Sequence, residues 1–305
     1  MDILILAEKK KNAEMFVSAI KAKGHNATYI RLSKIILVSK QNESLIKSKG
    51  EELAPYDAVF IQARTTLAPF IEPLLDQLES EGCYTTSKKG SYYIGMNEPY
   101  QFVTLSVAKA PIPKSITSGN AKNIEHLSKK LTYPLLAKSF IGRTVQQAIV
   151  VNNARALNSY IKSIKTEIDG FMLRQFSKAD IISSVMIGKK IFSVKRKFTD
   201  GITAEISEGK IYKVSESETK TIFSAAKACG YDIARVDLCK GKIVKVDPII
   251  PWTDFNKICS ERIEDYVADF LIEQAIQNEG KRKVKYDFLG LRKIFGKTIL
   301  GWLFK

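Results

Sequence analysis

The sequence of 305 residues predicts an α/β protein with more than one domain. An apolar fraction of 45% is sufficient to build hydrophobic cores. Short apolar runs of strand length alternate along the chain with longer amphipathic runs of helix length. The first of these read strand, helix, strand, which is typical of two parallel strands joined by a right-handed crossover. No uncharged apolar run of about 18 residues occurs, so we expect no membrane-spanning helix.

Residues 1–88 are expected to form a small α/β domain. Its strands are expected at residues 2–7, 27–32 and 57–62, with a further strand entered through residues 82–85. One helix ends at Gly24 and a second covers residues 70–78. The loop after the first strand lacks the G-x-G-x-x-G pattern, so the sequence does not predict a dinucleotide site there.

Two further subdomains are expected, over residues 89–170 and 171–280. Their helices are predicted at residues 99–110, 123–131, 153–163, 216–229 and 260–278. Their strands are predicted at residues 133–138, 147–151, 171–176, 181–187 and 190–197, followed by a hairpin over residues 235–247. Pro111 and Pro113 end the first of these helices, because proline cannot continue the helical hydrogen bonds.

The hairpin over residues 235–247 carries acidic and basic side chains at alternating positions. Because successive side chains of a strand point to opposite faces, the register must place apolar residues opposite apolar residues. A three-residue turn over residues 240–242 satisfies this, whereas a two-residue turn would place Asp237 opposite Val244. The three-residue turn gives the facing pairs Val236–Val246, Leu238–Val244, Asp237–Lys245 and Arg235–Asp247. Each pair of opposite charge contributes roughly 0.2–1 kcal/mol.

Charge and composition narrow the classes of partner. The net charge of +16 favours an anionic partner, namely a nucleotide, nucleic acid or a membrane surface. No run combines aromatic and basic residues as a nucleic-acid platform does, so nucleic acid is not expected. The four cysteines show no C-x-x-C spacing, which predicts reduced thiols in the cytoplasm and no structural zinc. Neither of the two histidines lies in a motif, so catalysis by histidine is not expected.

Residues 281–305 are expected to form a basic amphipathic tail. Eight of these residues are basic and one is acidic. Apolar residues follow helical spacing at Phe288, Leu291, Phe295, Ile299 and Trp302. Such a helix suits peripheral association with a membrane surface, or docking on a protein partner or on the body of the chain. Association of the chain with copies of itself is a further expectation.

From Tyr133 to about Phe270 the sequence resembles the ATP-grasp superfamily, and within it the RimK-like carboxylate–amine ligases. The order and spacing of several motifs carry the resemblance: Pro134–Lys138 with Gly142, Leu173–Phe176, Asp180–Ile181, Val185–Lys189, Ala225–Asp237 and the strand ending at Asp247. The pattern of residues 1–120 agrees with an N-terminal pre-ATP-grasp domain. The resemblance implies that ATP lies between two subdomains and that Mg²⁺ bridges its phosphates. A substrate carboxylate then becomes an acyl phosphate, which an amine attacks.

The resemblance implies a nucleotide site and a basic residue, Arg196, that faces the phosphates in a catalytic role. The nucleotide-binding residues implied are Lys138, Gly142, Arg143, Arg174, Gln175, Phe176 and Asp180. Two departures from the family pattern affect the phosphates. The loop at Gly142 has a single glycine where the family has several, and glycines allow backbone N–H groups to approach phosphate. No lysine is present near residues 98–100, where the family has its first nucleotide lysine.

The implied metal ligands are Asp237 and Asp247, but Lys245 stands where the family has a glutamate. An ammonium group beside two carboxylates repels Mg²⁺, which needs one or two free carboxylates. The leading hypothesis is therefore a RimK-like nucleotide-binding protein with a degraded metal and phosphate site and weak or lost ligase activity. One alternative is an active Mg²⁺-dependent ligase that joins a small-molecule or protein carboxylate to an amine. Another is an adaptor that binds a membrane or a partner through the tail.

Overall fold

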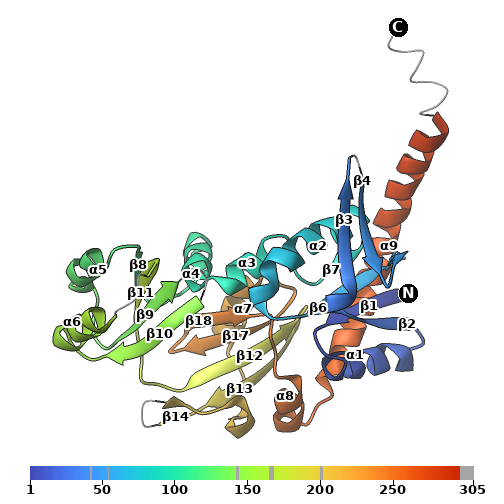
Figure 1. Ribbon diagram of the computed structural model, residues 1–305. Coiled ribbons are helices and arrows are strands. Elements are labelled where there is room, and N and C mark those ends of the chain that lie inside the picture. The colour runs from blue at the N-terminus through green and yellow to red at the C-terminus, as the bar shows by residue number, and fades with distance from the viewer. Residues whose placement is uncertain (42, 54, 142–143, 165–167, 200–201, 296–305) are drawn as a thin grey trace. The chain divides into compact units, whose positions relative to one another are not determined.

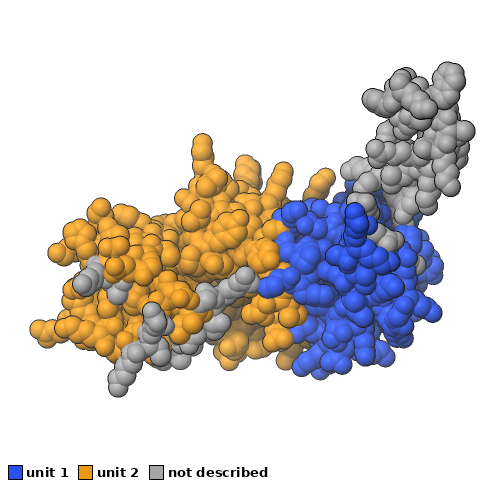
Figure 2. All heavy atoms as spheres, turned by 45° about the horizontal axis from the view of Figure 1, so that its top comes forward, with its two compact units in different colours: residues 1–63, 69–89, 262–305 blue, residues 64–68, 90–261 orange. Residues whose placement is uncertain are grey.

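The computed structural model describes residues 1–41, 43–53, 55–141, 144–164, 168–199 and 202–295. The chain divides into two compact units, which Figure 2 shows in different colours. Unit 1 comprises residues 1–63, 69–89 and 262–305, and unit 2 comprises residues 64–68 and 90–261. Both units contain helices and strands (Figure 1), which confirms the predicted α/β class.

Unit 1 is built on a parallel sheet with the order β2-β1-β6-β7. These strands are Asn26–Arg31, Asp2–Ala7, Ala58–Gln62 and Tyr84–Thr85. Helix α1 (Lys11–Ala22) joins β1 to β2, as the sequence predicts. Residues Ile3–Ala7 of β1 are completely buried. This strand is apolar without alternation because both faces of a parallel sheet are covered by helices. Helix α2 (Ala68–Ser80) precedes β7.

Three strands of unit 1 were not predicted. They are β3 (Ile35–Lys40), β4 (Glu43–Ser48) and β5 (Glu51–Glu52), and they form a separate antiparallel sheet. Ile46 is buried in this sheet whereas Ile36 is exposed. β3 begins with the apolar run Ile35–Val38, whereas β4 and β5 are mostly polar, so only β3 carries a sequence signal for a strand.

The long helix α9 (Ile263–Phe295) belongs to unit 1. It contacts α1, β1, β6 and β7 through an apolar face formed by Val267, Ala268, Leu271 and Ala275, all fully buried. The sequence prediction instead assigned residues 263–280 to the same subdomain as residues 171–261. The side chains of residues 281–295 and all of residues 296–305 lie outside the described part, so the predicted amphipathic face of the tail does too. Within the residues described, no helix is long and apolar enough to cross a membrane.

Unit 2 contains two antiparallel sheets, which include the strands predicted between residues 133 and 247. The first has the order β10-β9-β11-β8, with strands Thr144–Val151, Leu135–Ile141, Gly170–Gln175 and Ser115–Ser118. Helices α5 (Ala121–Ser128) and α6 (Ala154–Ser163) supply apolar side chains to the core beside this sheet. Helices α3 (Ser91–Met96) and α4 (Glu98–Val107) precede the sheet in the chain.

The second sheet of unit 2 has the order β16-β13-β12-β17-β18. Its strands are Lys210–Ile211, Lys190–Arg196, Ile181–Ile187, Ile233–Cys239 and Lys242–Asp247. Helix α8 (Trp252–Cys259) follows β18, and a small ribbon is formed by β14 (Phe198–Thr199) and β15 (Ile202–Thr203). Short 3-10 helices cover Leu32–Lys34, Thr65–Leu67 and Ile206–Glu208.

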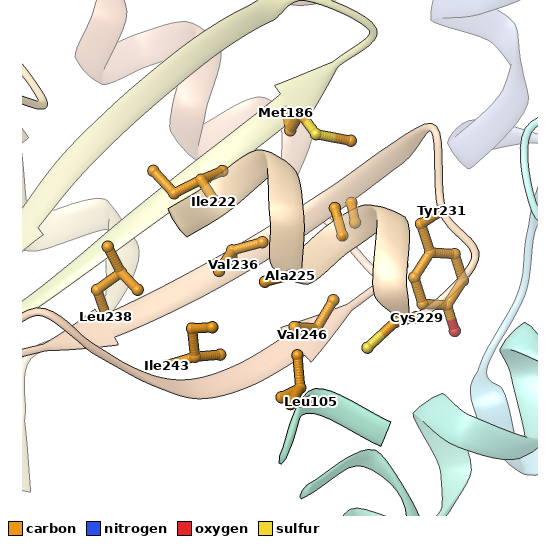
Figure 3. Close-up of a cluster of buried hydrophobic side chains, with 12 residues drawn as sticks. Leu105, Met186, Ile222, Ala225, Cys229, Tyr231, Val236, Leu238, Ile243 and Val246 are labelled. Atoms are coloured by element: carbon orange, nitrogen blue, oxygen red, sulfur yellow. The ribbon is translucent and has the colours of Figure 1, made fainter. Parts of the chain in front are cut away.

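Helix α7 (Glu216–Ala228) covers one face of the second sheet (Figure 3). The buried side chains between them include Met186, Ile222, Ala225, Val236, Leu238 and Val246, with Leu105 of α4 at the edge. Because side chains alternate along a strand, the residues between these positions point to the opposite face. That opposite face carries the charged side chains of β17 and β18.

The N-terminus of α7 is a capping box. The Ser215 hydroxyl accepts a hydrogen bond from the Glu218 N–H, and the Glu218 carboxylate accepts one from the Ser215 N–H. We expect Ser215→Ala to lower the free energy of unfolding by about 1 kcal/mol, because a backbone donor loses its partner. Urea unfolding would measure the change. Ser217→Ala, inside the first turn, is the matched control, and an equal loss in both variants would contradict the capping role.

The hairpin of β17 and β18 confirms three of the four predicted pairs, which are Arg235–Asp247, Val236–Val246 and Asp237–Lys245. The fourth is wrong, because Leu238 faces Ile243 instead of Val244. The turn has two residues, Lys240 and Gly241, with φ of 48° and 72°. Such a pair of positive φ angles is typical of the type I′ turns that suit the twist of a hairpin. Val244 is the extra residue of a β-bulge, which restores the apolar register beyond the turn.

Candidate functional site

A cavity of about 510 Å³ lies in unit 2 and is lined from both of its sheets and from the start of α4. Its lining includes three acidic and three basic side chains: Glu98, Asp169 and Asp237, and Lys138, Arg174 and Lys245. The cavity therefore brings together Lys138, Arg174 and Asp237, three residues that the sequence predicted for one site. Its volume is within the range of about 300–1,000 Å³ that small-molecule sites occupy.

Lys138 of β9 and Arg174 of β11 point to the same face of the first sheet. Their strands pair so that Lys138 lies opposite Met172 and Arg174 opposite Leu136, which puts both cations on one side. Glu98, the first residue of α4, forms ion pairs with both: with the Lys138 ammonium, and with Nη1 of Arg174 at 3.1 Å. We call these three residues the Glu98 cluster.

Arg174 is the most deeply buried member of the Glu98 cluster. Its Nη1 also donates a hydrogen bond to the Val244 carbonyl, at 2.8 Å, and its guanidinium lies 5.2 Å from the centre of the Phe102 ring. Burial lowers the pKa of Arg174, and the neighbouring Glu98 carboxylate acts in the opposite direction. The charge of Arg174 is thus maintained by partners from α4 and β18.

Asp237 of β17 is 5% exposed and is surrounded by donors. The Ser183 hydroxyl donates to its Oδ1 at 2.6 Å, because Ser183 of β12 lies directly opposite Asp237 in the ladder. Nη2 of Arg196 lies 3.5 Å from Oδ2, and Nε of Arg235 lies 3.4 Å from Oδ1. Burial lowers the pKa of Arg196, and the Asp237 carboxylate opposes that change. Nε of Arg196 also donates to the Ser183 hydroxyl, at 2.9 Å.

Asp247 of β18 is bound in the same way. Nζ of Lys245 lies 2.6 Å and Nη2 of Arg235 lies 3.3 Å from its Oδ2, and its Oδ1 accepts a hydrogen bond from the Ile249 N–H. The sequence predicted that Lys245 would pair with Asp237 across the ladder. Lys245 instead reaches its neighbour two positions along the same strand, since residues i and i+2 share a face. Asp237, Asp247, Arg196, Arg235 and Lys245 form what we call the Asp237 cluster.

The Asp237 cluster does not fit a pair of Mg²⁺ ions. Each of its two carboxylates already contacts two cationic side chains, and Mg²⁺ would have to displace them. Among the residues described, no group of three histidine, cysteine or acidic side chains is placed to hold a metal ion.

The other predicted nucleotide residues divide into three groups. Gln175 and Phe176 line a second cavity, of about 300 Å³, together with Tyr133 and Phe198. The backbone N–H group of Gln175 donates to the Lys114 carbonyl and that of Phe176 to the Pro134 carbonyl, so both donors are already engaged. Asp180 lines neither cavity. Gly142 and Arg143 lie outside the described residues.

The Asp180 carboxylate contacts two neighbouring groups of the same sheet region. Its Oδ1 accepts a hydrogen bond from the Phe198 N–H at 3.0 Å, and its Oδ2 lies 3.2 Å from Nζ of Lys195. The Phe198 hydrogen bond first, and then Lys195, lower the pKa of Asp180. These contacts link the start of β12 to the end of β13 and do not direct the carboxylate into a cavity.

Two residues of the site were not assigned a role from the sequence. The sequence-based prediction states only that no lysine is present near residues 98–100. The acid at this point, Glu98, is the signal for a pairing with Lys138. The signal for Ser183 is the pair of serines, Ser183 and Ser184, within an otherwise apolar strand, since buried hydroxyl groups need partners.

Comparisons with known proteins agree with this architecture. Residues 1–91 match the family model of the RimK PreATP-grasp domain. The ATP-grasp ligase PsnB, solved with a minimal precursor, has a TM-score of 0.70 at 13% identity, covering 90% of this chain and 98% of that one. The macrocyclase MdnC from Microcystis aeruginosa, solved with precursor peptide MdnA, has a TM-score of 0.64 at 15% identity, covering 90% and 100%. The fold is therefore the ATP-grasp fold.

Two curated relatives refine this class. A protein of Desulfotalea psychrophila named probable alpha-L-glutamate ligase is 24% identical over 249 residues, which are 79% of this chain and 54% of that protein. A protein of Aliivibrio fischeri with the same name is 21% identical over 300 residues, 93% and 100% of the two chains. This chain thus spans about half the length of the first relative and the whole of the second. Together with the match over residues 1–91, these relatives make the chain similar to RimK-like ATP-grasp proteins along most of its length.

Proposed function

We propose that this chain is a RimK-like nucleotide-binding protein in which carboxylate–amine ligation is weak or lost. One observation carries the proposal: both carboxylates at the family's metal position, Asp237 and Asp247, are neutralised by side chains of the protein itself. In a ligase of this class the metal ions neutralise the transferring phosphoryl group, so a site without them loses its main source of charge stabilisation.

Electrostatics opposes Mg²⁺ at the Asp237 cluster. Two unit charges about 4 Å apart interact by about 4 kcal/mol at an effective dielectric constant of about 20. A divalent ion beside Asp247 would face Lys245 and Arg235 at comparable distances, because both contact the same Oδ2 atom. The repulsion from the two side chains offsets the attraction of the carboxylate.

Nucleotide binding is supported by the cavity and by the solved relatives. The cavity of about 510 Å³ presents Lys138, which the resemblance assigns to the phosphates, and Arg174, which the resemblance assigns to the segment that faces the adenine. PsnB has been solved in complex with Mg and ADP, and also with AMPPNP and a precursor peptide. For this chain we propose binding of the nucleotide but not of the metal.

Calorimetric titration of the full chain with ATP, in Mg²⁺ and in EDTA, tests the proposal. We expect the two affinities to agree within about twofold, because no metal contributes to binding. We also expect no ADP release above background when glutamate is supplied as carboxylate and amine. Absence of ATP binding in both buffers would reject the nucleotide role.

The alternative is an active Mg²⁺-dependent ligase in which Asp237 and Asp247 hold one ion. It predicts ATP binding that needs Mg²⁺, together with ADP release that Asp237→Asn abolishes. That pair of results would replace our proposal with this alternative.

A further inference from the structure

The Glu98 cluster places an anion of the protein where the phosphates of a nucleotide are expected. The carboxylate of Glu98 contacts both cations of this part of the cavity, Lys138 and Arg174. The side chains of Glu98, Lys138 and Arg174 are 22%, 16% and 11% exposed, so water screens these contacts only partly. The two cations and one anion leave a single net positive charge.

Glu98 is delivered to this position by a well-anchored helix. Asn97 caps α4 by accepting a hydrogen bond from the Tyr100 N–H, and an acid in the first turn is favoured by the helix dipole. One turn further on, Gln101 is buried and holds α4 to β18: its amide donates to the Val246 carbonyl at 2.7 Å and accepts from the Val246 N–H at 2.9 Å. The backbone beside Glu98 is therefore held to β18 of the second sheet, and movement of the Glu98 side chain alone can release the two cations.

Arg174 connects this anion to the other side of the site. It extends from β11 of the first sheet to the Val244 carbonyl on β18 of the second, at 2.8 Å. Both Arg174 and Val244 line the cavity of about 510 Å³ and also the cavity of about 300 Å³. Arg174 thus stands between the two cavities, held there by Glu98 and Val244. A ligand that occupies both cavities has to move Arg174.

We propose that Glu98 is an internal competitor for the anion site, and that a polyphosphate ligand binds only by displacing its carboxylate from Lys138 and Arg174. The inference rests on the proposed nucleotide role and adds its regulation. Binding of an anion in place of Glu98 also frees Arg174 from one of its two anchors, which opens the path between the cavities. A triphosphate cannot share the two cations with Glu98, because like charges in a partly dehydrated site repel by several kcal/mol.

The test compares wild type with Glu98→Gln in calorimetric titrations with ATP and with inorganic triphosphate, at constant ionic strength. We expect Glu98→Gln to bind both ligands at least about tenfold more tightly, which corresponds to about 1.4 kcal/mol. Glu216→Gln is the matched control, since it removes one carboxylate from the exposed start of α7 and should change neither affinity. The triphosphate arm isolates the anion site from any contribution of the adenosine.

A second variant separates displacement from net charge and from damage to the fold. Glu98→Gln combined with Lys138→Gln removes one charge of each sign, so its affinity for triphosphate should return to within about threefold of wild type. Thermal unfolding with and without triphosphate shows that each variant is folded, and the gain in Tm on adding triphosphate should be largest for Glu98→Gln.

The outcomes distinguish this inference from the proposed function. If wild type and Glu98→Gln bind ATP with equal affinity, the competitor role of Glu98 is wrong while nucleotide binding stands. If folded wild type and folded Glu98→Gln both fail to bind ATP and triphosphate, both proposals are rejected. If Glu98→Gln binds both ligands more tightly than wild type and Glu216→Gln does not, both proposals are supported.

Discussion

Substituting Lys245 by glutamate should raise the affinity of the protein for Mg²⁺ by at least about tenfold. The Lys245 side chain is 54% exposed, lines the larger cavity and lies 2.6 Å from Asp247. The substitution removes a positive charge from this carboxylate and adds a third acid beside Asp237 and Asp247, and hard cations bind oxygen ligands of this kind. Titration of the variant with Mg²⁺ by calorimetry, or with Mn²⁺ by electron paramagnetic resonance, measures the gain.

Lys242→Glu is the control for this substitution. It makes the same change of charge in the same strand, at an exposed residue that does not contact the two acids. We expect it to change the Mg²⁺ affinity by less than about twofold. A folded Lys245→Glu variant with the affinity of wild type would contradict the view that Lys245 keeps the site free of metal.

The second large effect is expected for stability. Asp237→Asn should lower the free energy of unfolding by about 3–5 kcal/mol, because it removes the buried carboxylate that Arg196 contacts and one of the two that Arg235 contacts. Asparagine has nearly the same shape and can still accept the hydrogen bond from Ser183, so the loss reports the charge. Urea unfolding measures it as a lower midpoint at an unchanged m-value.

The two interpretations of Asp237, as a carboxylate neutralised by arginines and as a ligand in an open metal site, predict different changes in stability for Asp237→Asn. If Asp237 belonged to an open metal site, its removal without metal would relieve repulsion between acids and leave stability unchanged or improved. Glu216→Gln, which disrupts an exposed pair with Lys220, provides the baseline for an ordinary surface ion pair of about 0.3–0.5 kcal/mol. A loss for Asp237→Asn no larger than that baseline would show that the Asp237 cluster does not hold the sheet together.

Sequence patterns predicted the elements with strong periodicity and missed those that depend on distant contacts. The apolar run of β1 and the alternation in β17 were sufficient to place these strands. The sheet of β3, β4 and β5 was not predicted: β3 has a short apolar run, but β4 and β5 are mostly polar and lack the alternation of a half-buried strand. The pattern of α9 predicts a helix but contains no information about which sheet its apolar face will cover, and it packs in unit 1.

The site shows the same limit at the level of single residues. The family resemblance assigned Lys138 and Arg174 to one nucleotide site, and both line the larger cavity. Pairing of either cation with Glu98 depends on where α4 is anchored, through the contact of Gln101 with Val246, which is 145 residues away in sequence. Lys245 contacts Asp247 and not the facing Asp237, because the direction of a long side chain decides its partner. The pairing of Cα positions between two strands does not specify that direction.

The bulge at Val244 has a consequence for how this hairpin tolerates changes in length. Every other residue of β18 has a facing partner on β17. Deletion of Val244 alone would therefore leave the two-residue turn, the apolar pairs and the charged pairs in register, and would remove only the residue whose carbonyl receives Arg174. The bulge therefore allows this hairpin to lose one residue while its facing pairs are kept, so the contact of Arg174 with β18 can change independently of the pairing of the two strands.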